Sequence, residues 1–253
     1  MRLSKYHSCE NTFLITMYDK KYNYNNVALN LCSKEKYDVD GLLVLKTDPI
    51  EVLIFNKDGS EARMCGNGLN CMTHYCYDKF KIYKYIKFKT KSNSYECEIL
   101  KKIPFYSCVN LGKGIYHNNI IKQKTIIKDI WYEITMFELG VLHAVIVMDD
   151  LIDVSNIAID IFESEFIKRS ANIDFVKIIK ENTVELITYE KGVGFTKACG
   201  TGASSVAFVL NNVYGLDNFI DVITEGGVLK IEISDSIYLN AESVFVMDME
   251  EEI

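Results

Sequence analysis

Long hydrophobic runs and an excess of basic residues are missing from this 253-residue chain. No apolar run approaches the roughly 20 residues that cross a membrane as a helix. Lys and Arg number 28 against 35 Asp and Glu, a net charge of −7, which argues against nucleic acid as a partner. Residues 1–30 lack the order of a signal peptide, so we expect a cytoplasmic protein that binds neither membrane nor nucleic acid.

Paired Cys-x-x-Cys motifs are missing as well, although the chain has eight cysteines. Their scattered spacing gives no zinc pattern and favours reduced thiols in a cytosolic protein, so no metal is predicted. Cys71, Cys76, Cys97 and Cys108 lie among Tyr, Phe and Val, where a thiol behaves as a small buried apolar group. Cys65 and Cys199 stand apart because each is followed by Gly-x-Gly.

Segments typical of β-strands dominate the pattern. Residues 11–19, 41–46 and 50–56 are rich in β-branched and aromatic side chains, and residues 85–102 alternate about Ser92-Asn93-Ser94 as a hairpin does. Helices are expected in only four places: residues 26–36, the segment after Gly68 to about Lys79, residues 153–170, and the segment after Gly202 to about Tyr214. Mostly antiparallel sheets around a few helices predict the α+β class.

An internal repeat divides the chain. FNKDGSEARMCGNG (55–68) and YEKGVGFTKACGTG (189–202) share a strand end, a glycine loop, Cys-Gly-x-Gly and a helix start. The two cysteines are 199 − 65 = 134 residues apart, about half of the chain. We therefore expect two similar halves that place Cys65 and Cys199 across a cleft. The polar segment 113–125 is the best candidate for a linker between them.

A cysteine at the start of a helix lies beside unpaired backbone N–H groups, which favour the thiolate. Glycines in the same turn let the backbone approach an anion closely. Two such sites suit a reaction that removes a proton from one face of a carbon and delivers one to the other. The residues therefore point to inversion of a carbon centre beside a carboxylate. A redox exchange between the two thiols is the other chemistry open to them, and we interpret it as inactivation by oxidation.

The two cysteine motifs resemble the paired motifs of diaminopimelate epimerases, a family that acts without pyridoxal phosphate. The start, SKYHSCENTF, is similar to the N-terminal segment of that family, and the similarity runs through the whole chain in order. The resemblance implies two pseudo-symmetric halves, each a mostly antiparallel sheet wrapped around a central helix. It places residues 1–112 with about 245–253 in the Cys65 half, and residues 113–244 in the Cys199 half. It also implies an amino-acid substrate, no cofactor, and compatibility with a homodimer.

Site residues follow from the same resemblance. Cys65 and Cys199 match the catalytic acid–base pair, and His143 and Glu190 match the groups near the reacting amine. The residues that match substrate contacts, several of them in the backbone cradle for the carboxylate, are Asn11, Asn56, Gly66, Asn67, Asn172, Lys191, Gly200 and Thr201.

Departures from the family pattern concern recognition of the distal end of the substrate. Val141 stands where the family has a substrate-binding Asn, and Lys191 where it has an Arg. An ammonium cannot grip a carboxylate with two parallel hydrogen bonds as a guanidinium does. Asn70 also replaces an Arg, and Ser8-Cys9-Glu10 replaces a glycine-rich loop. These changes slightly favour an amino acid other than diaminopimelate as the substrate, with diaminopimelate itself as the alternative.

Two hypotheses from other classes stay open at this point. One is an isomerase that shifts a proton along an unsaturated acid, and the other is a binder of amino acids without catalysis. Deuterium uptake from solvent separates all three functions, because racemisation labels the Cα atom and a binder incorporates no label.

Overall fold

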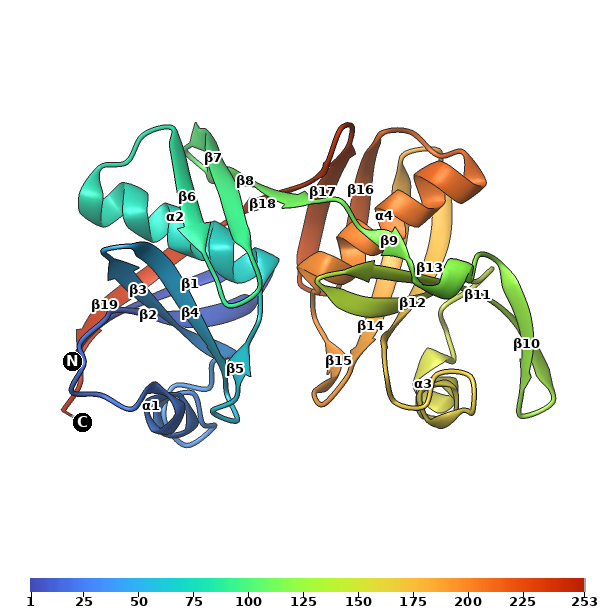
Figure 1. Ribbon diagram of the computed structural model, residues 1–253, viewed down its shortest axis with the longest axis horizontal. Coiled ribbons are helices and arrows are strands. Elements are labelled where there is room, and N and C mark those ends of the chain that lie inside the picture. Colours follow the sequence, from blue (N-terminus) through green and yellow to red (C-terminus); the bar gives the residue numbers. More distant parts are fainter. Residues whose placement is uncertain (253) are drawn as a thin grey trace. The chain divides into compact units, whose positions relative to one another are not determined.

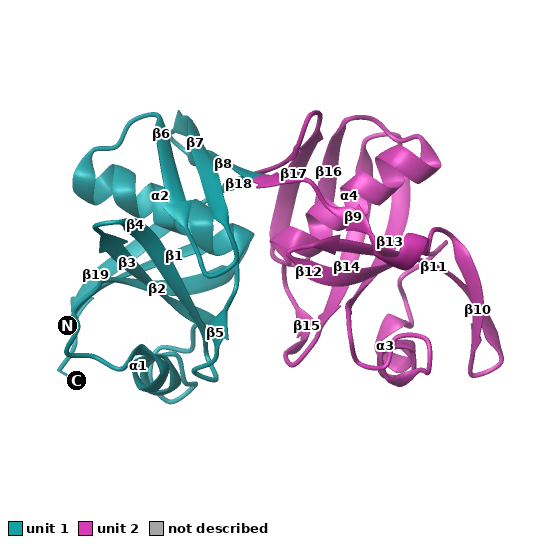
Figure 2. Ribbon diagram, in the orientation of Figure 1, with its two compact units in different colours: residues 1–110, 240–253 teal, residues 111–239 magenta. Residues whose placement is uncertain are grey.

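A computed structural model describes residues 1–252, and the chain divides into two compact units. Unit 1 comprises Met1–Asn110 and the C-terminal segment that begins at Asn240, and unit 2 comprises Leu111–Leu239 (Figure 2). The chain passes from one unit to the other twice, once within the strand Phe105–Gly112 and once within the strand Ile237–Glu242.

Unit 1 contains two helices and a sheet. Its elements are β1 (Arg2–Ser8), β2 (Asn11–Met17), α1 (Tyr24–Leu31), β3 (Gly41–Thr47), β4 (Ile50–Asn56), β5 (Glu61–Ala62), α2 (Gly66–Phe80), β6 (Tyr85–Lys89), β7 (Ser94–Lys102), β8 (Phe105–Gly112) and β19 (Val244–Glu250). Hydrogen bonding gives the order β19-β1-β2-β3-β4-β6-β7-β8, with β2/β3 and β4/β6 parallel and the other neighbours antiparallel. Helix α2 contacts β1, β2, β7 and β19, so the sheet wraps around it (Figure 1).

Unit 2 repeats this plan. Its elements are β9 (Ile115–Tyr116), a 3₁₀ turn (His117–Asn119), β10 (Gln123–Ile127), β11 (Ile130–Leu139), β12 (Val141–Val147), α3 (Val154–Glu163), β13 (Asn172–Lys180), β14 (Thr183–Glu190), β15 (Gly194–Thr196), α4 (Gly200–Tyr214), β16 (Phe219–Thr224), β17 (Gly227–Ile233) and β18 (Ile237–Glu242). The order β10-β11-β12-β13-β14-β16-β17 has parallel pairs at β12/β13 and β14/β16, as in unit 1. Helix α4 contacts β11, β12, β13, β16 and β17. The two units therefore have the same topology, and each has its own central helix.

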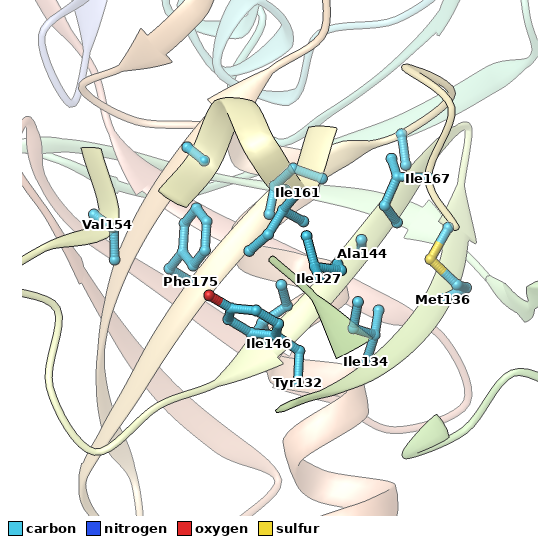
Figure 3. Packing of buried hydrophobic residues seen from close by; sticks show 13 residues of the cluster. Ile127, Tyr132, Ile134, Met136, Ala144, Ile146, Val154, Ile161, Ile167 and Phe175 are labelled. Carbon is cyan, nitrogen blue, oxygen red and sulfur yellow. The ribbon is translucent and has the colours of Figure 1, made fainter. Parts of the chain in front are cut away.

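The central helices are largely buried because each packs against its sheet. Ten residues of α2 and ten of α4 are buried, and both helices begin directly after a cysteine. In unit 2 a second core layer fills the space between the sheet and α3, where Ile134, Ile146, Ile161 and Phe175 meet (Figure 3). Burial of such aliphatic and aromatic side chains supplies the main driving force for folding.

The end of the chain belongs to the unit that holds its start. Strand β19 pairs antiparallel with β1, from Arg2 opposite Glu250 to His7 opposite Val244. The backbone N–H of Glu251 donates to the carbonyl of Met1 at 2.9 Å, and Figure 1 shows β19 running beside β1.

Comparison with the sequence predictions confirms the α+β class, the hairpin of β6 and β7, and the buried state of Cys71, Cys76, Cys97 and Cys108. The prediction of a linker at 113–125 was wrong, because these residues form β9, the 3₁₀ turn and the start of β10 within unit 2. The helix expected at 153–170 ends at Glu163, where the Ser164 hydroxyl bonds the carbonyl of Ile161. None of the helices in residues 1–252 is long and apolar enough to span a membrane.

Candidate active site

Cys65 is the N-cap of α2. Its backbone is extended, and its Sγ accepts a hydrogen bond from the N–H of Gly68 at 3.4 Å. The first turn of α2 holds no acidic side chain, so the positive end of the helix dipole is uncompensated there. The side chain of Cys65 is only partly buried.

Asn11 and Asn67 lie beside Cys65 in unit 1. Asn11, at the start of β2, presents its Oδ1 at 4.0 Å from Cys65 Sγ and accepts from Asn67 Nδ2 at 3.4 Å. Gly66 and Asn67 are buried in the first turn of α2. The Asn56 side chain points to a different partner. It is exposed at the end of β4, and its amide donates to the Ser60 hydroxyl at 2.9 Å across a turn.

Cys199 is the N-cap of α4 and repeats the geometry of Cys65. Its Sγ accepts from the N–H of Gly202 at 3.4 Å, and the first turn again has no acidic residue. Cys199 is 7% exposed, more buried than Cys65. Burial raises the pKa of the Cys199 thiol well above its ordinary value, the nearby Glu190 and Asp174 raise it further, and hydrogen bonds from Thr201 and Gly202 oppose the rise. Burial and the two neighbouring carboxylates therefore favour the neutral thiol form of Cys199.

Strands β12, β13 and β14 bring further side chains to the N-terminus of α4. His143 on β12 is the register partner of Asn172 on β13, and its Nε2 lies 3.1 Å from the hydroxyl of Thr201. The Thr201 hydroxyl in turn lies 3.4 Å from Cys199 Sγ. His143, Thr201 and Cys199 thus form one continuous buried chain of contacts.

Glu190 is the last residue of β14, and Lys191 follows it in a turn. The hydroxyl of Thr196 donates to Glu190 Oε1 at 2.6 Å, and the Asn172 side chain accepts from the Lys191 backbone N–H at 2.9 Å. Burial raises the pKa of Glu190, while the bond from Thr196 and the nearby His143 lower it. The Lys191 side chain is exposed, and Val141 at the start of β12 is 38% exposed.

Sequence reasoning missed Asp174 and Thr188. Asp174 lies two residues after Asn172 on β13, and is therefore on the same face of the sheet; it is 2.7 Å from His143 Nδ1. Thr188 is its register partner on β14 and donates to it at 2.8 Å. A carboxylate between Ile173 and Phe175 in an apolar strand was the signal that could have found it.

The side chains of residues 1–252 form no cluster suited to a metal ion. Within the part of the chain that the structure describes, no group of three or more His, Cys, Asp or Glu side chains could hold an ion. No disulfide joins any of the eight cysteines, all of which lie in the described residues.

A sequence model of the family described as diaminopimelate epimerase matches residues 135–247. A curated relative from Alkaliphilus metalliredigens, named diaminopimelate epimerase, is 31% identical over 92% of this chain and 90% of its own length. The chain belongs to the diaminopimelate epimerase family. It is thus a member of a family of isomerases, and the resemblance carried by the two cysteine motifs is confirmed.

Solved structures agree on the fold of the family. A hydroxyproline epimerase from Agrobacterium vitis matches 98% of this chain and 91% of its own with a TM-score of 0.78 at 10% identity. A phenazine biosynthesis protein of the PhzF family from Bacillus anthracis covers 100% of this chain and 99% of its own with a TM-score of 0.75 at 11% identity. Because proteins with such different names share the architecture, the fold alone does not specify the reaction.

Proposed function

We propose that this protein is a cofactor-independent epimerase that inverts the Cα of diaminopimelate, converting the LL form to the meso form. The observation that carries the proposal is the matched pair of N-cap thiols, each bonded to a glycine N–H at 3.4 Å at the start of a buried helix. Curated relatives of about 30% identity over most of the chain are named diaminopimelate epimerase, which supports this substrate over the other amino acids that the sequence slightly favoured.

In the proposed mechanism each unit supplies one base. One cysteine, as the thiolate, takes the proton from Cα, and the other, as the thiol, delivers a proton to the opposite face. Negative charge spreads onto the substrate carboxylate as the proton leaves. Backbone N–H groups of Gly66, Asn67, Gly200 and Thr201 stabilise that charge, because they are already oriented before the reaction.

His143 and Glu190 are assigned to the surroundings of the reacting amine, and Asn11, Asn56 and Asn172 to polar contacts with the substrate. The exposed Lys191 ammonium is assigned to the distal carboxylate of diaminopimelate. A single ammonium can make this contact, although with less directional hold than a guanidinium.

A second candidate is an epimerase of an amino acid with a less polar distal end. Val141 favours it, because an exposed apolar side chain offers no hydrogen bond where the family has an amide. Incubation with LL-diaminopimelate and a panel of L-amino acids, followed by chiral chromatography, separates the two candidates. Turnover confined to diaminopimelate supports our proposal, whereas turnover of another amino acid without diaminopimelate supports the second candidate.

The double variant Val141→Asn with Lys191→Arg sharpens this test. If diaminopimelate is the substrate, the variant gains a hydrogen bond and a two-point contact, so its KM for diaminopimelate falls by about tenfold or more while kcat stays similar. If the second candidate is right, the wild type is inactive on diaminopimelate and only the double variant turns it over. The Val141→Thr variant serves as a control for polarity alone.

A further inference from the structure

Asp174 is a charged side chain placed in the interior of unit 2. Its side chain and that of His143 are both 0% exposed, and Oδ2 lies 2.7 Å from His143 Nδ1. Oδ1 accepts from the Thr188 hydroxyl at 2.8 Å. A buried carboxylate without partners would be very costly, and here donors engage both of its oxygens.

This contact fixes how His143 is protonated. Because the Asp174 carboxylate accepts, His143 Nδ1 carries a hydrogen, and Nε2 is the nitrogen that faces Thr201 at 3.1 Å. In the neutral imidazole, Nε2 accepts from the Thr201 hydroxyl, which leaves the Thr201 oxygen to accept from the Cys199 thiol at 3.4 Å. The hydrogen bonds then run in one direction: the Cys199 thiol donates to Thr201, and the Thr201 hydroxyl donates to His143.

The titratable groups that face His143 come from three elements. Asp174 comes from β13, Glu190 from β14 and Cys199 from the N-cap of α4, and all of them interact electrostatically with one another or with the imidazole. Glu190 is therefore a second candidate to receive the Cys199 proton. Cys199 also makes a side-chain hydrogen bond with Glu190, so both acceptors are within reach of the thiol. The two differ in one respect that an experiment can use: only the path to His143 runs through the Thr201 hydroxyl and depends on Asp174.

We propose that Asp174 is a positioning residue that holds His143 as the proton acceptor and donor for Cys199, through the Thr201 hydroxyl. This inference rests on the proposed function, in which Cys199 must alternate between thiol and thiolate. The thiol proton moves to Thr201 Oγ1 while the Thr201 proton moves to His143 Nε2. Cys199 is left as the thiolate and His143 as the imidazolium, whose charge the Asp174 carboxylate balances; the reverse transfer restores the thiol.

A structural or purely electrostatic role for Asp174 predicts a different outcome. The negative charge of Asp174 raises the pKa of Cys199, so its removal alone lowers that pKa and speeds alkylation of the thiol. If Asp174 instead positions His143, Asp174→Asn makes His143 a weaker acceptor of the Cys199 proton. The apparent pKa of Cys199 then rises, and alkylation by iodoacetamide at fixed pH slows by about tenfold per pKa unit.

The experiment follows alkylation of the Cys199 peptide by mass spectrometry across pH in the folded full-length protein. Asp174→Asn and Thr201→Val are expected to slow it, Thr201→Ser to restore it, and Thr188→Val to leave it close to the wild-type rate, because the last variant keeps the contact between Asp174 and His143. Faster alkylation in Asp174→Asn would overturn the proposal. Slower alkylation in Glu190→Gln with no change in Asp174→Asn would also overturn it and assign the proton to Glu190.

Nitrogen-15 NMR of the His143 ring supplies a readout that needs no substrate. The wild type should show a hydrogen-bonded Nδ1–H, and Asp174→Asn should lose or shift it, whereas an unchanged ring signal would count against the inference. Turnover separates this inference from the proposed function. A wild type without any epimerase activity refutes the function, while an active wild type with an equally active Asp174→Asn variant refutes only the inference. The expected fall in kcat is about 10²-fold.

Discussion

Gly202 and Gly68 occupy equivalent positions, three residues after each N-cap cysteine, but their surroundings differ. A Cβ atom added at Gly202 would lie 2.6 Å from Asp174 Oδ1 and 3.2 Å from the Thr188 hydroxyl. At Gly68 it would lie 3.2 Å from Leu43 Cδ2, the end of a flexible side chain. The contact at Gly202 cannot relax without moving the buried Asp174 carboxylate, which is held by two hydrogen bonds.

Gly202→Ala should therefore displace Asp174 and His143, and lower kcat by about 10²-fold, since small misplacements near reacting groups have effects of that size. Gly68→Ala, the matched variant in unit 1, should lose less because Leu43 can change rotamer. Steady-state kinetics on both variants, with circular dichroism to check folding, measures the difference. Equal losses in the two variants would show that the approach of Asp174 to α4 does not matter.

Glu190 gives a pH-dependent prediction at the same scale. Burial raises the pKa of Glu190 above the value near 4.3 that it has in the unfolded chain. A group with a raised folded pKa contributes stability that is fully present below the unfolded pKa and is lost as pH rises through the folded pKa. Ionised Glu190 should therefore lower the stability of the wild type at neutral and alkaline pH.

Glu190→Gln should raise the melting temperature at pH 8 by about 2–4 °C, the change expected for roughly 1 kcal/mol in a chain of this size. The gain should shrink as pH falls through the unfolded value of about 4.3, and it should vanish well below that pH, where the wild-type carboxyl is protonated in both states. Activity should fall in the same variant, as is common when a strained site is relieved. A destabilised Glu190→Gln at pH 8, measured by thermal unfolding, would contradict this account.

At the scale of elements, Asp248 attaches β19 to the rest of unit 1. The Ser4 hydroxyl of β1 donates to Asp248 Oδ1 at 2.5 Å, and the Lys79 ammonium of α2 lies 2.7 Å from Oδ2. These contacts lower the pKa of Asp248, the bond from Lys79 first and that from Ser4 second. One carboxylate thus links the last strand to the first strand and to the central helix.

Asp248→Asn should lower the melting temperature at pH 7 by about 1–3 °C, a modest effect because the pair is half-exposed and screened by salt. A lowered folded pKa gives stability above the unfolded value near 3.9 that is lost as pH falls through the folded pKa, so the difference should disappear in acid. Glu250→Gln is the control, since its ion pair with Arg2 is highly exposed. A larger effect in the control than in Asp248→Asn would refute the role of Asp248.

The local elements of the site could be predicted from sequence, whereas its buried network could not. Cys65 and Cys199 were found because Cys-Gly-x-Gly after a strand is a local pattern. The starts of both central helices were placed three residues late, because the cysteine itself is the N-cap. Asp174 and Thr188 meet through the antiparallel register of β13 and β14, and His143 meets them through the parallel register of β12 and β13. Register between strands is a tertiary property, which a single sequence does not reveal.

At the scale of the whole molecule, two units of the same topology each supply one N-cap cysteine. Sheet order, the positions of the parallel pairs and the contacts of the central helix repeat from unit 1 to unit 2. The duplication is not exact in chemistry. Cys199 is buried beside Glu190, Asp174 and His143, whereas Cys65 is partly exposed beside Asn11 and Asn67. Similar folds thus provide two thiols in different environments, and the proposed reaction would use one as the acid and the other as the base.

The most direct test of the two-thiol mechanism is solvent labelling during turnover of LL-diaminopimelate in deuterium oxide. The wild type should give the meso product with one deuterium at the inverted Cα, read by chiral chromatography and mass spectrometry. Cys65→Ser and Cys199→Ser should each lower the rate of inversion by about 10²–10⁴-fold, because a hydroxyl is a far weaker base than a thiolate. Inversion at a near-normal rate in either variant, or a labelled position other than Cα, would contradict the mechanism.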